Sequence, residues 1–262
     1  MLFIKKIKTY LYGFIIITVL WYIAFLNIQL PIVPSPLKIY TKIIEIFNNT
    51  IAIHVLYSLA RIFGGIFLSL IIGVPIGYLM GYYKSIDKLL SPLIYFTYPV
   101  PKMALLPIVM LIFGLGESSK IIMLVMIVIF QIIITARDSV KAIPKETYHS
   151  LYSLGASKLQ IFREIVFPAS FSEIITATRL ALGTAVSILF FTETYGTRFG
   201  MGYFIMDSWM RVNYVEMYCG IVHLNIVYSH VEMYCGIVVL SIMGVLIFAV
   251  IDILESYVCA WR

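Results

Sequence analysis

The stretch GIVVLSIMGVLIFAVI, residues Gly236–Ile251, contains no charged side chain and no alternation of polar and apolar positions. Such a run favours a helix inside a lipid bilayer, because a helix satisfies its own backbone hydrogen bonds, whereas a membrane-barrel strand alternates in polarity. Ile121–Phe130 has the same character. The composition agrees, since 61% of the 262 residues are hydrophobic and 12% are charged, and the mean hydropathy is +0.99. We therefore expect an all-α polytopic membrane protein.

Apolar segments long enough to cross a bilayer occur at six places. They are Leu11–Leu30, Leu56–Met80, Leu89–Phe113, Lys120–Ala136, Ile174–Thr194 and Met233–Ile251. Basic residues concentrate before the first of them, at Lys5–Lys8, and in the loop Arg137–Glu173. Because basic loops stay in the cytoplasm, we expect a multi-pass protein of the cell membrane with both termini cytoplasmic. The net charge of +6 lies in these short loops, so it predicts no nucleic-acid partner.

Two segments interrupt the pattern of spans. Pro34–Thr50 is too polar to cross the bilayer, but its apolar residues recur at helical spacing, which predicts an interfacial helix at about residues 34–50. Pro99, Pro101 and Pro107 lie within the third span. Proline cannot donate a backbone hydrogen bond, so the freed carbonyls need another partner or a wet cavity. We expect a helix broken near its middle, a feature typical of segments that line a transport pathway.

The longest polar stretch, Arg137–Glu173, has the pattern of two short helices joined by a turn. Pro144 suits the first turn of a helix and Gly155 suits its end. Ser157–Gln160 forms a capping-box pattern that opens a second helix, and we expect Pro168 to stop it. The stretch therefore predicts a cytoplasmic helix–turn–helix at about residues 137–173.

A local repeat precedes the last span. The octapeptide Val-Glu-Met-Tyr-Cys-Gly-Ile-Val occurs at Val215–Val222 and again at Val231–Val238, a tandem duplication that spans residues 215–238. Only the second copy runs into a continuous apolar stretch. The first is followed by His223, Asn225 and His230, which are costly in lipid, so we place it outside the bilayer or on a protein-lined surface. Cys219, Cys235 and Cys259 lack metal-ligand spacing, and we interpret them as packing residues with no metal site.

The stretch Tyr148–Pro168, YHSLYSLGASKLQIFREIVFP, resembles the coupling loop of binding-protein-dependent ABC importer permeases. The loop's pattern is Glu-Ala-Ala, then Gly four residues on, then Ile and Leu-Pro. Gly155, Ile165 and Pro168 match at the right spacing, whereas His149–Leu151 stands in place of Glu-Ala-Ala. The resemblance implies contact with an ATPase subunit through His149, Ser150, Leu151, Leu154, Gly155, Ala156, Ile161, Ile165 and Pro168.

Other stretches look like the nitrate, sulfonate and taurine branch of that family. They include Tyr98–Pro101 with Ala104–Pro107, Phe113–Glu117 and Gly200–Tyr203. The resemblance implies one permease domain over residues 1–262, a second permease copy, surrounding membrane lipid and an extracytoplasmic binding protein. No Gly-x-x-x-x-Gly-Lys-Ser/Thr loop occurs, so we expect no cofactor in this chain, with ATP and Mg bound by the partner ATPase. The implied cargo is a small anion or sulfonate-like solute, with a small heterocycle as an alternative.

Charges and prolines inside the spans are candidates for the translocation pathway, because intramembrane charges usually face a bundle interior or water. The candidates are Arg61, Pro99, Pro101, Arg179 and Glu193. The alternatives are a structural role for Arg61 and snorkelling of Arg179 at its helix end. A competing functional class is a polytopic membrane enzyme with a lipid substrate, which would use Glu193, His223 or His230. These residues lack a metal spacing or a supporting acid–base pattern, so we assign no catalytic residue.

Overall fold

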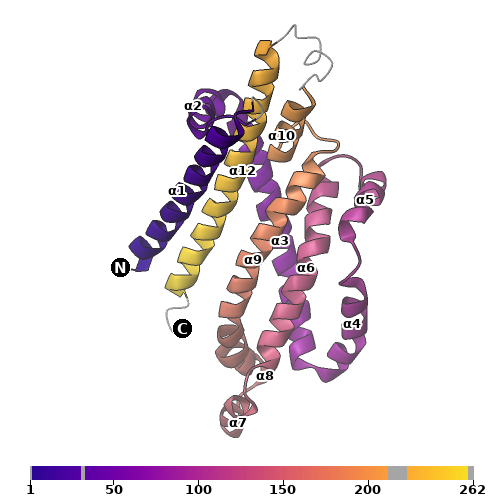
Figure 1. The fold of residues 1–262 in the computed structure, drawn as a ribbon. Helices are drawn as coiled ribbons and strands as arrows, with labels where there is room; N and C mark the ends of the chain where they lie inside the picture. The colour runs from indigo at the N-terminus through magenta and orange to yellow at the C-terminus, as the bar shows by residue number, and fades with distance from the viewer. Residues whose placement is uncertain (1, 31–32, 212–222, 259–262) are drawn as a thin grey trace. The chain divides into compact units, whose positions relative to one another are not determined.

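The computed structural model of the protein describes residues 2–30, 33–211 and 223–258 (Figure 1). Within these ranges every regular element is a helix, which confirms the expected all-α fold. The chain divides into two compact units. The first comprises Met1–Ser58 with Glu193–Val245, and the second comprises Leu59–Thr192 with Leu246–Arg262.

The predicted spans are present as helices. Within the described ranges, five helices are long and apolar enough to cross a bilayer alone. They include all or most of α1 (Leu2–Ile28), α3 (Ala52–Tyr82), α6 (Glu117–Lys141), α9 (Phe167–Glu193) and α12 (His223–Val258). The sixth is broken, because α4 (Lys84–Thr97) is bent by 80° from the segment formed by a 3-10 turn (Lys102–Leu105) and α5 (Leu106–Phe113). The expected break in the third span is therefore confirmed.

In the first unit, the segment between the first two spans is helical, as predicted. Here α2 (Pro36–Ile46) begins after Ser35, whose side-chain oxygen accepts the N–H of Lys38 at 3.4 Å. The helix continues through a π-helical turn, Phe47–Ile51, directly into α3. The predicted interfacial helix is thus joined to the second span without an intervening loop.

Close packing of α10 (Met201–Met210) against α12 forms the centre of the first unit. A Cβ atom at Gly236 would lie 2.6 Å from Cγ1 of Ile205 and 2.9 Å from Cδ1 of Phe204. Real side chains do not approach so closely, so only glycine permits this contact between the two helices.

The second copy of the repeat belongs to this core. Val231 is 2% exposed and Cys235 is fully buried, which confirms that Cys235 is a packing residue. His230 is also buried, as expected for a polar side chain that is kept away from lipid. The first copy, Val215–Val222, lies outside the described residues.

In the second unit, α3 packs closely along α6. A Cβ atom at Gly77 would lie 2.6 Å from Cβ of Ala136, and one at Gly81 would lie 2.6 Å from Cβ of Val140. The two glycines are one helical turn apart and therefore lie on the same face of α3. Small residues at this spacing let two membrane helices approach closely, so the ends of α3 and α6 nearest the long loop are held together.

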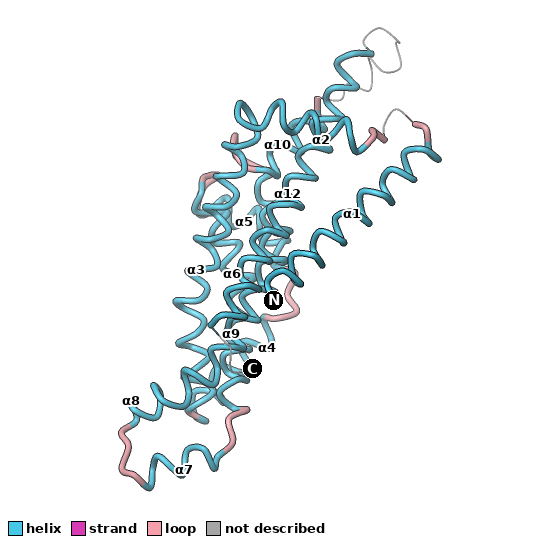
Figure 2. Tube along the Cα trace, turned by 90° about the vertical axis from the view of Figure 1, so that its left-hand side faces the viewer, coloured by secondary structure: helices cyan, strands magenta, loops and turns pink. Residues whose placement is uncertain are grey.

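The long loop contains α7 (Lys145–Ser153) and α8 (Lys158–Ile161), which lie together at one end of the second unit (Figure 2). The expectation that Pro168 stops the second helix is wrong, because residues 158–193 form one continuous helix of 36 residues. A π-helical turn, Phe162–Val166, precedes the proline. The wider turn shifts the hydrogen-bond register before Pro168, which allows the helix to pass a residue that cannot donate.

Candidate functional site

The turn between α7 and α8 has the geometry that the glycine predicts. Gly155 has a φ of +77°, a left-handed conformation that favours glycine. Its N–H donates to the carbonyl oxygen of Tyr152 at 3.0 Å, and the N–H of Ala156 donates to that of Leu151 at 3.0 Å. This pair of hydrogen bonds is a Schellman motif, which satisfies the last carbonyls of a helix.

The capping box that opens α8 is also confirmed. The Ser157 hydroxyl oxygen accepts the N–H of Gln160 at 3.3 Å, and Oε1 of Gln160 accepts the N–H of Ser157 at 2.8 Å. Because this motif follows Gly155 after a single residue, the directions of α7 and α8 are both set locally.

The nine residues predicted to couple to an ATPase do not share one surface. His149, Ser150, Leu154, Gly155 and Pro168 are exposed, and Leu151 and Ala156 are half-buried. Ile161 is fully buried and Ile165 is 7% exposed, so these two side chains hold the second helix in its own unit. Leu154 is 81% exposed, and Leu159, which the sequence did not single out, is 76% exposed. The exposed apolar surface of the hairpin is therefore centred on these two leucines.

The base of the hairpin is tied to α3 by aromatic side chains. The hydroxyl oxygens of Tyr82 and Tyr152 are 3.1 Å apart, and the Ser170 hydroxyl donates to that of Tyr78 at 2.7 Å. Tyr78 also packs edge-on against Phe162, with ring centroids 5.5 Å apart. Burial raises the pKa of the nearby Tyr148 hydroxyl, so this tyrosine stays neutral at ordinary pH. The hairpin is thus attached to the spans by side chains as well as by the chain.

The break at Pro99 and Pro101 is stabilised by a lysine that the sequence analysis did not identify. The ammonium of Lys102 donates to the carbonyl oxygens of Thr97 at 3.1 Å and Tyr98 at 3.0 Å. In an unbroken helix the carbonyl oxygen of Thr97 would accept the N–H of residue 101, but Pro101 has no N–H. Lys102 therefore supplies the partner that the sequence analysis required for the freed carbonyls.

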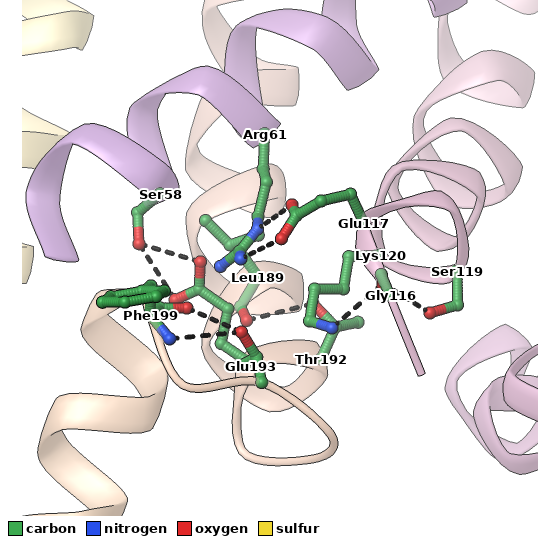
Figure 3. A network of polar contacts seen from close by, with 12 residues as sticks. Ser58, Arg61, Gly116, Glu117, Ser119, Lys120, Leu189, Thr192, Glu193 and Phe199 are labelled. Atoms are coloured by element: carbon green, nitrogen blue, oxygen red, sulfur yellow. Dashed lines mark hydrogen bonds and ion pairs between the residues drawn. The ribbon is translucent and has the colours of Figure 1, made fainter. Parts of the chain in front are cut away.

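Arg61 is engaged in an ion pair. Its side chain is 2% exposed, and its Nε and Nη2 atoms donate to the two carboxylate oxygens of Glu117, each at 2.6 Å (Figure 3). The ammonium of Lys120, on the next turn of α6, donates to the carbonyl oxygens of Leu115 at 2.9 Å and Gly116 at 3.1 Å. A two-pronged contact with a carboxylate satisfies the guanidinium geometry. This pairing favours the structural role for Arg61.

Glu193 organises the start of α10 (Figure 3). It is fully buried, and its Oε2 accepts the N–H of Gly202 at 2.9 Å, while the Ser58 hydroxyl contacts both carboxylate oxygens at 2.9 Å. Ser58 also accepts the N–H of Met201 at 2.8 Å, and Nδ1 of His54 accepts that of Gly200 at 3.1 Å. These contacts satisfy donors that a helix leaves open at its first turn. The structure thus gives Glu193 a capping role.

Arg179 lies in an ion-pair cluster. Its Nη1 is 2.5 Å from Oδ1 of Asp252 and 2.9 Å from Oε2 of Glu255, and the Thr176 hydroxyl donates to Oε1 of Glu255 at 2.9 Å. The arginine side chain is 21% exposed, so its charge is largely surrounded by the protein. These contacts fasten α9 to the end of α12 and favour a structural role over snorkelling. In the described part of the chain, no group of three or more His, Cys, Asp or Glu residues is arranged to hold a metal ion.

One exposed face of α9 carries small and polar residues. Gly183, Thr184 and Ser187 are exposed, and no atom would lie within 4 Å of a Cβ at Gly183. The Ser187 hydroxyl donates to the carbonyl oxygen of Gly183 at 3.2 Å. This face is not evident from the sequence, because the neighbouring residues make the span apolar on average. A helix face of this type suits a water-filled path or a closely packed helix better than lipid.

Comparison with known families decides among these interpretations. The profile of the family described as "Binding-protein-dependent transport system inner membrane component" matches residues 73–258. This chain belongs to that family. It is accordingly the membrane-spanning permease component of an ABC importer, a multi-pass membrane protein that is not an enzyme. Membership excludes the alternative of a membrane enzyme with a lipid substrate, and it implies an ATPase and a substrate-binding protein as partners.

Individual relatives of the permease agree. This permease is 29% identical over 201 residues to the taurine transport system permease protein TauC of Escherichia coli. The alignment covers 74% of this chain and 73% of that protein. The permease is 27% identical over 250 residues to the formylaminopyrimidine transport permease protein ThiX of Halalkalibacterium halodurans, covering 95% and 94%. Among solved structures, a chain of the MetNI methionine ABC transporter in an inward-facing conformation matches with a TM-score of 0.53 and 20% identity, covering 76% of this permease and 94% of that chain. The last likeness supports the fold.

Proposed function

We propose that this permease docks an ATPase subunit through the α7–α8 hairpin and imports a small anionic or sulfonate-like solute through a path between two copies of the chain. The ATPase binds ATP and Mg, and a binding protein delivers the solute to the opposite side of the membrane. Both termini and the hairpin lie in the cytoplasm in this arrangement. Each step rests on a different observation.

The observation that carries the docking step is the exposure of Leu154 and Leu159. Leu154 is 81% exposed and Leu159 is 76% exposed, whereas Ile161 and Ile165 of the same hairpin are buried. Burying one leucine side chain stabilises an interface by about 1.5–3 kcal/mol. A short rigid helix with an exposed apolar face is the form of ligand that a groove on a partner protein accepts.

The path between two copies is supported by the small, polar face of α9. One chain offers a single hairpin, whereas a symmetric pair of ATPase subunits needs two. The exposed Gly183, Thr184 and Ser187 would face the second copy or the water-filled path between the copies. Placing them there removes exposed polar side chains from lipid.

The orientation rests on the distribution of basic residues. Loops on the side of the N-terminus and of the hairpin carry the larger share of Lys and Arg, which fits the positive-inside rule. The class of cargo rests on the relatives, whose names refer to taurine and to a formylaminopyrimidine. Taurine carries a sulfonate group, so a sulfonate-like solute remains our proposal and a small heterocycle its alternative.

The docking step is tested with Leu154→Asp, using Ser153→Asp as the matched control. Both variants add one negative charge to exposed neighbouring positions, but only the first removes an apolar contact. We expect Leu154→Asp to weaken binding of the purified ATPase by at least about tenfold, since an apolar contact is lost and a charge is desolvated. Ser153→Asp should bind as the wild type does. Equal binding by Leu154→Asp and the wild type would exclude this hairpin as the docking element.

A further inference from the structure

Arg137 is a buried arginine at the end of α6 from which the hairpin leaves. It is 7% exposed, and its guanidinium donates to the hydroxyl of Tyr95 at 2.6 Å and to that of Ser91 at 3.2 Å. It also stacks on the Tyr95 ring, with 5.3 Å between Cζ and the ring centroid, and approaches Asp87 at 3.7 Å. Ser91, Tyr95 and Asp87 all belong to α4, the first half of the broken span.

The charges around Arg137 compensate one another. Asp87 accepts hydrogen bonds from the Lys141 ammonium at 2.6 Å and the Ser91 hydroxyl at 2.9 Å. Asp138 accepts one from Nε of Arg137 at 2.8 Å. Two cations therefore face two carboxylates. A basic residue that served only to orient the chain in the membrane would need none of these contacts, because the positive-inside rule acts through charge alone.

The helix is interrupted on both sides of α4, so contacts with α6 help to set its position. Before it lies Tyr83, which has extended backbone angles, and after it lies the break at Tyr98–Pro101. Apart from Arg137 and the ion pair of Lys141 with Asp87, the contact between α4 and α6 is apolar, centred on Ile94 and Ile133. Apolar contacts resist separation but resist sliding weakly, whereas a forked guanidinium fixes both distance and direction.

We propose that Arg137 is a positioning residue that locks α4 to the root of the coupling hairpin, so that displacement of the hairpin changes the bend at Tyr98–Pro101. The inference rests on the coupling role proposed above. It makes the broken span, rather than α6 and α9 alone, a moving part of the path. Arg137 acts through α4 and is not expected to touch the solute.

The test measures the bend itself, which requires no knowledge of the solute. Spin labels are attached at Leu93→Cys on α4 and Leu111→Cys on α5, both exposed positions, with the native cysteines replaced by alanine. The full complex with the ATPase is assembled with labelled chains diluted by unlabelled ones. The label-to-label distance is then compared between the nucleotide-free state and the state trapped with Mg-ATP and orthovanadate.

In the labelled protein with Arg137 intact, we expect the label-to-label distance to change between the two states. The change should be lost in Arg137→Met. It should be partly restored in Arg137→Lys, because lysine keeps the positive charge but lacks the planar guanidinium. Arg137→Met leaves Asp87 paired with Lys141, so the fold and ATPase binding should persist. The matched control is Lys141→Met, which removes the exposed partner of the same Asp87 and should leave the distance change intact.

Three outcomes overturn the positioning role of Arg137. They are no change of the label-to-label distance with Arg137 intact, a full distance change in Arg137→Met, or an equal loss of the distance change in Lys141→Met and Arg137→Met. The proposed function fails by a different measurement, retention of ATPase binding in Leu154→Asp. If Leu154→Asp abolishes binding while Arg137→Met keeps the full distance change, the hairpin couples the two proteins and only the role of Arg137 is refuted.

Discussion

Replacing Gly155 by valine should weaken docking of the ATPase without disturbing the spans. At a φ of +77°, a β-branched residue is strained by about 1–2 kcal/mol. No neighbouring atom lies within 4 Å of a Cβ built at Gly155, so the cost is one of backbone strain and not of steric overlap. The strain lowers the population of the docking-competent turn by about 5- to 30-fold, and the apparent affinity for the ATPase falls by the same factor.

The assay is titration of the purified permease, in detergent or nanodiscs, with its ATPase, together with thermal unfolding of the permease alone. Gly155→Asn is the matched control, because asparagine tolerates the left-handed region. It should bind within a few-fold of the wild type. The reasoning is refuted if Gly155→Val binds as tightly as Gly155→Asn, or if its loss of affinity is matched by loss of the folded permease.

Three further results are expected. An impermeant thiol reagent applied to intact cells should label Lys38→Cys and not Ser157→Cys; the reverse pattern would invert the proposed orientation. Glu193→Ala should lower the melting temperature more than Glu193→Gln, because it leaves buried donors unpaired at a cost of about 1–3 kcal/mol, and equal melting temperatures would argue against the capping role. Gly236→Ala should destabilise the permease by about 1–3 kcal/mol through overpacking, whereas Gly220→Ala, the same position in the first repeat copy, should be neutral if that copy is dispensable.

Local features of the hairpin and the spans could be predicted from the sequence because their causes lie within a few residues. Gly155 and the Ser157–Gln160 box act on their immediate neighbours, and Pro99 and Pro101 break the helix in which they occur. The end of the second short helix was mispredicted at Pro168. A proline does stop an ideal α-helix, but the preceding π-helical turn depends on how the surrounding side chains pack.

The roles of the buried polar residues could not be predicted, because their partners are distant in the chain. Ser58 and Glu193 are 135 residues apart, and no periodicity relates a carboxylate to the helix start that it caps. Intramembrane charge singled out Arg61, Arg179 and Glu193 as candidates for the translocation pathway. It could not show that each is occupied by contacts within its own unit, since that depends on the three-dimensional arrangement of helices.

The continuity of residues 158–193 gives this permease a lever arm. At 1.5 Å per residue, a helix of 36 residues is about 54 Å long. A tilt of about 5° pivoting at Lys158 would carry the far end through about 5 Å, by the same geometry. A stop at Pro168 would have separated the short helix from the span by a hinge, and such a hinge would have absorbed the rotation. The π-helical turn keeps the helix continuous across Pro168, so a tilt at Lys158 is carried to the far end of the helix.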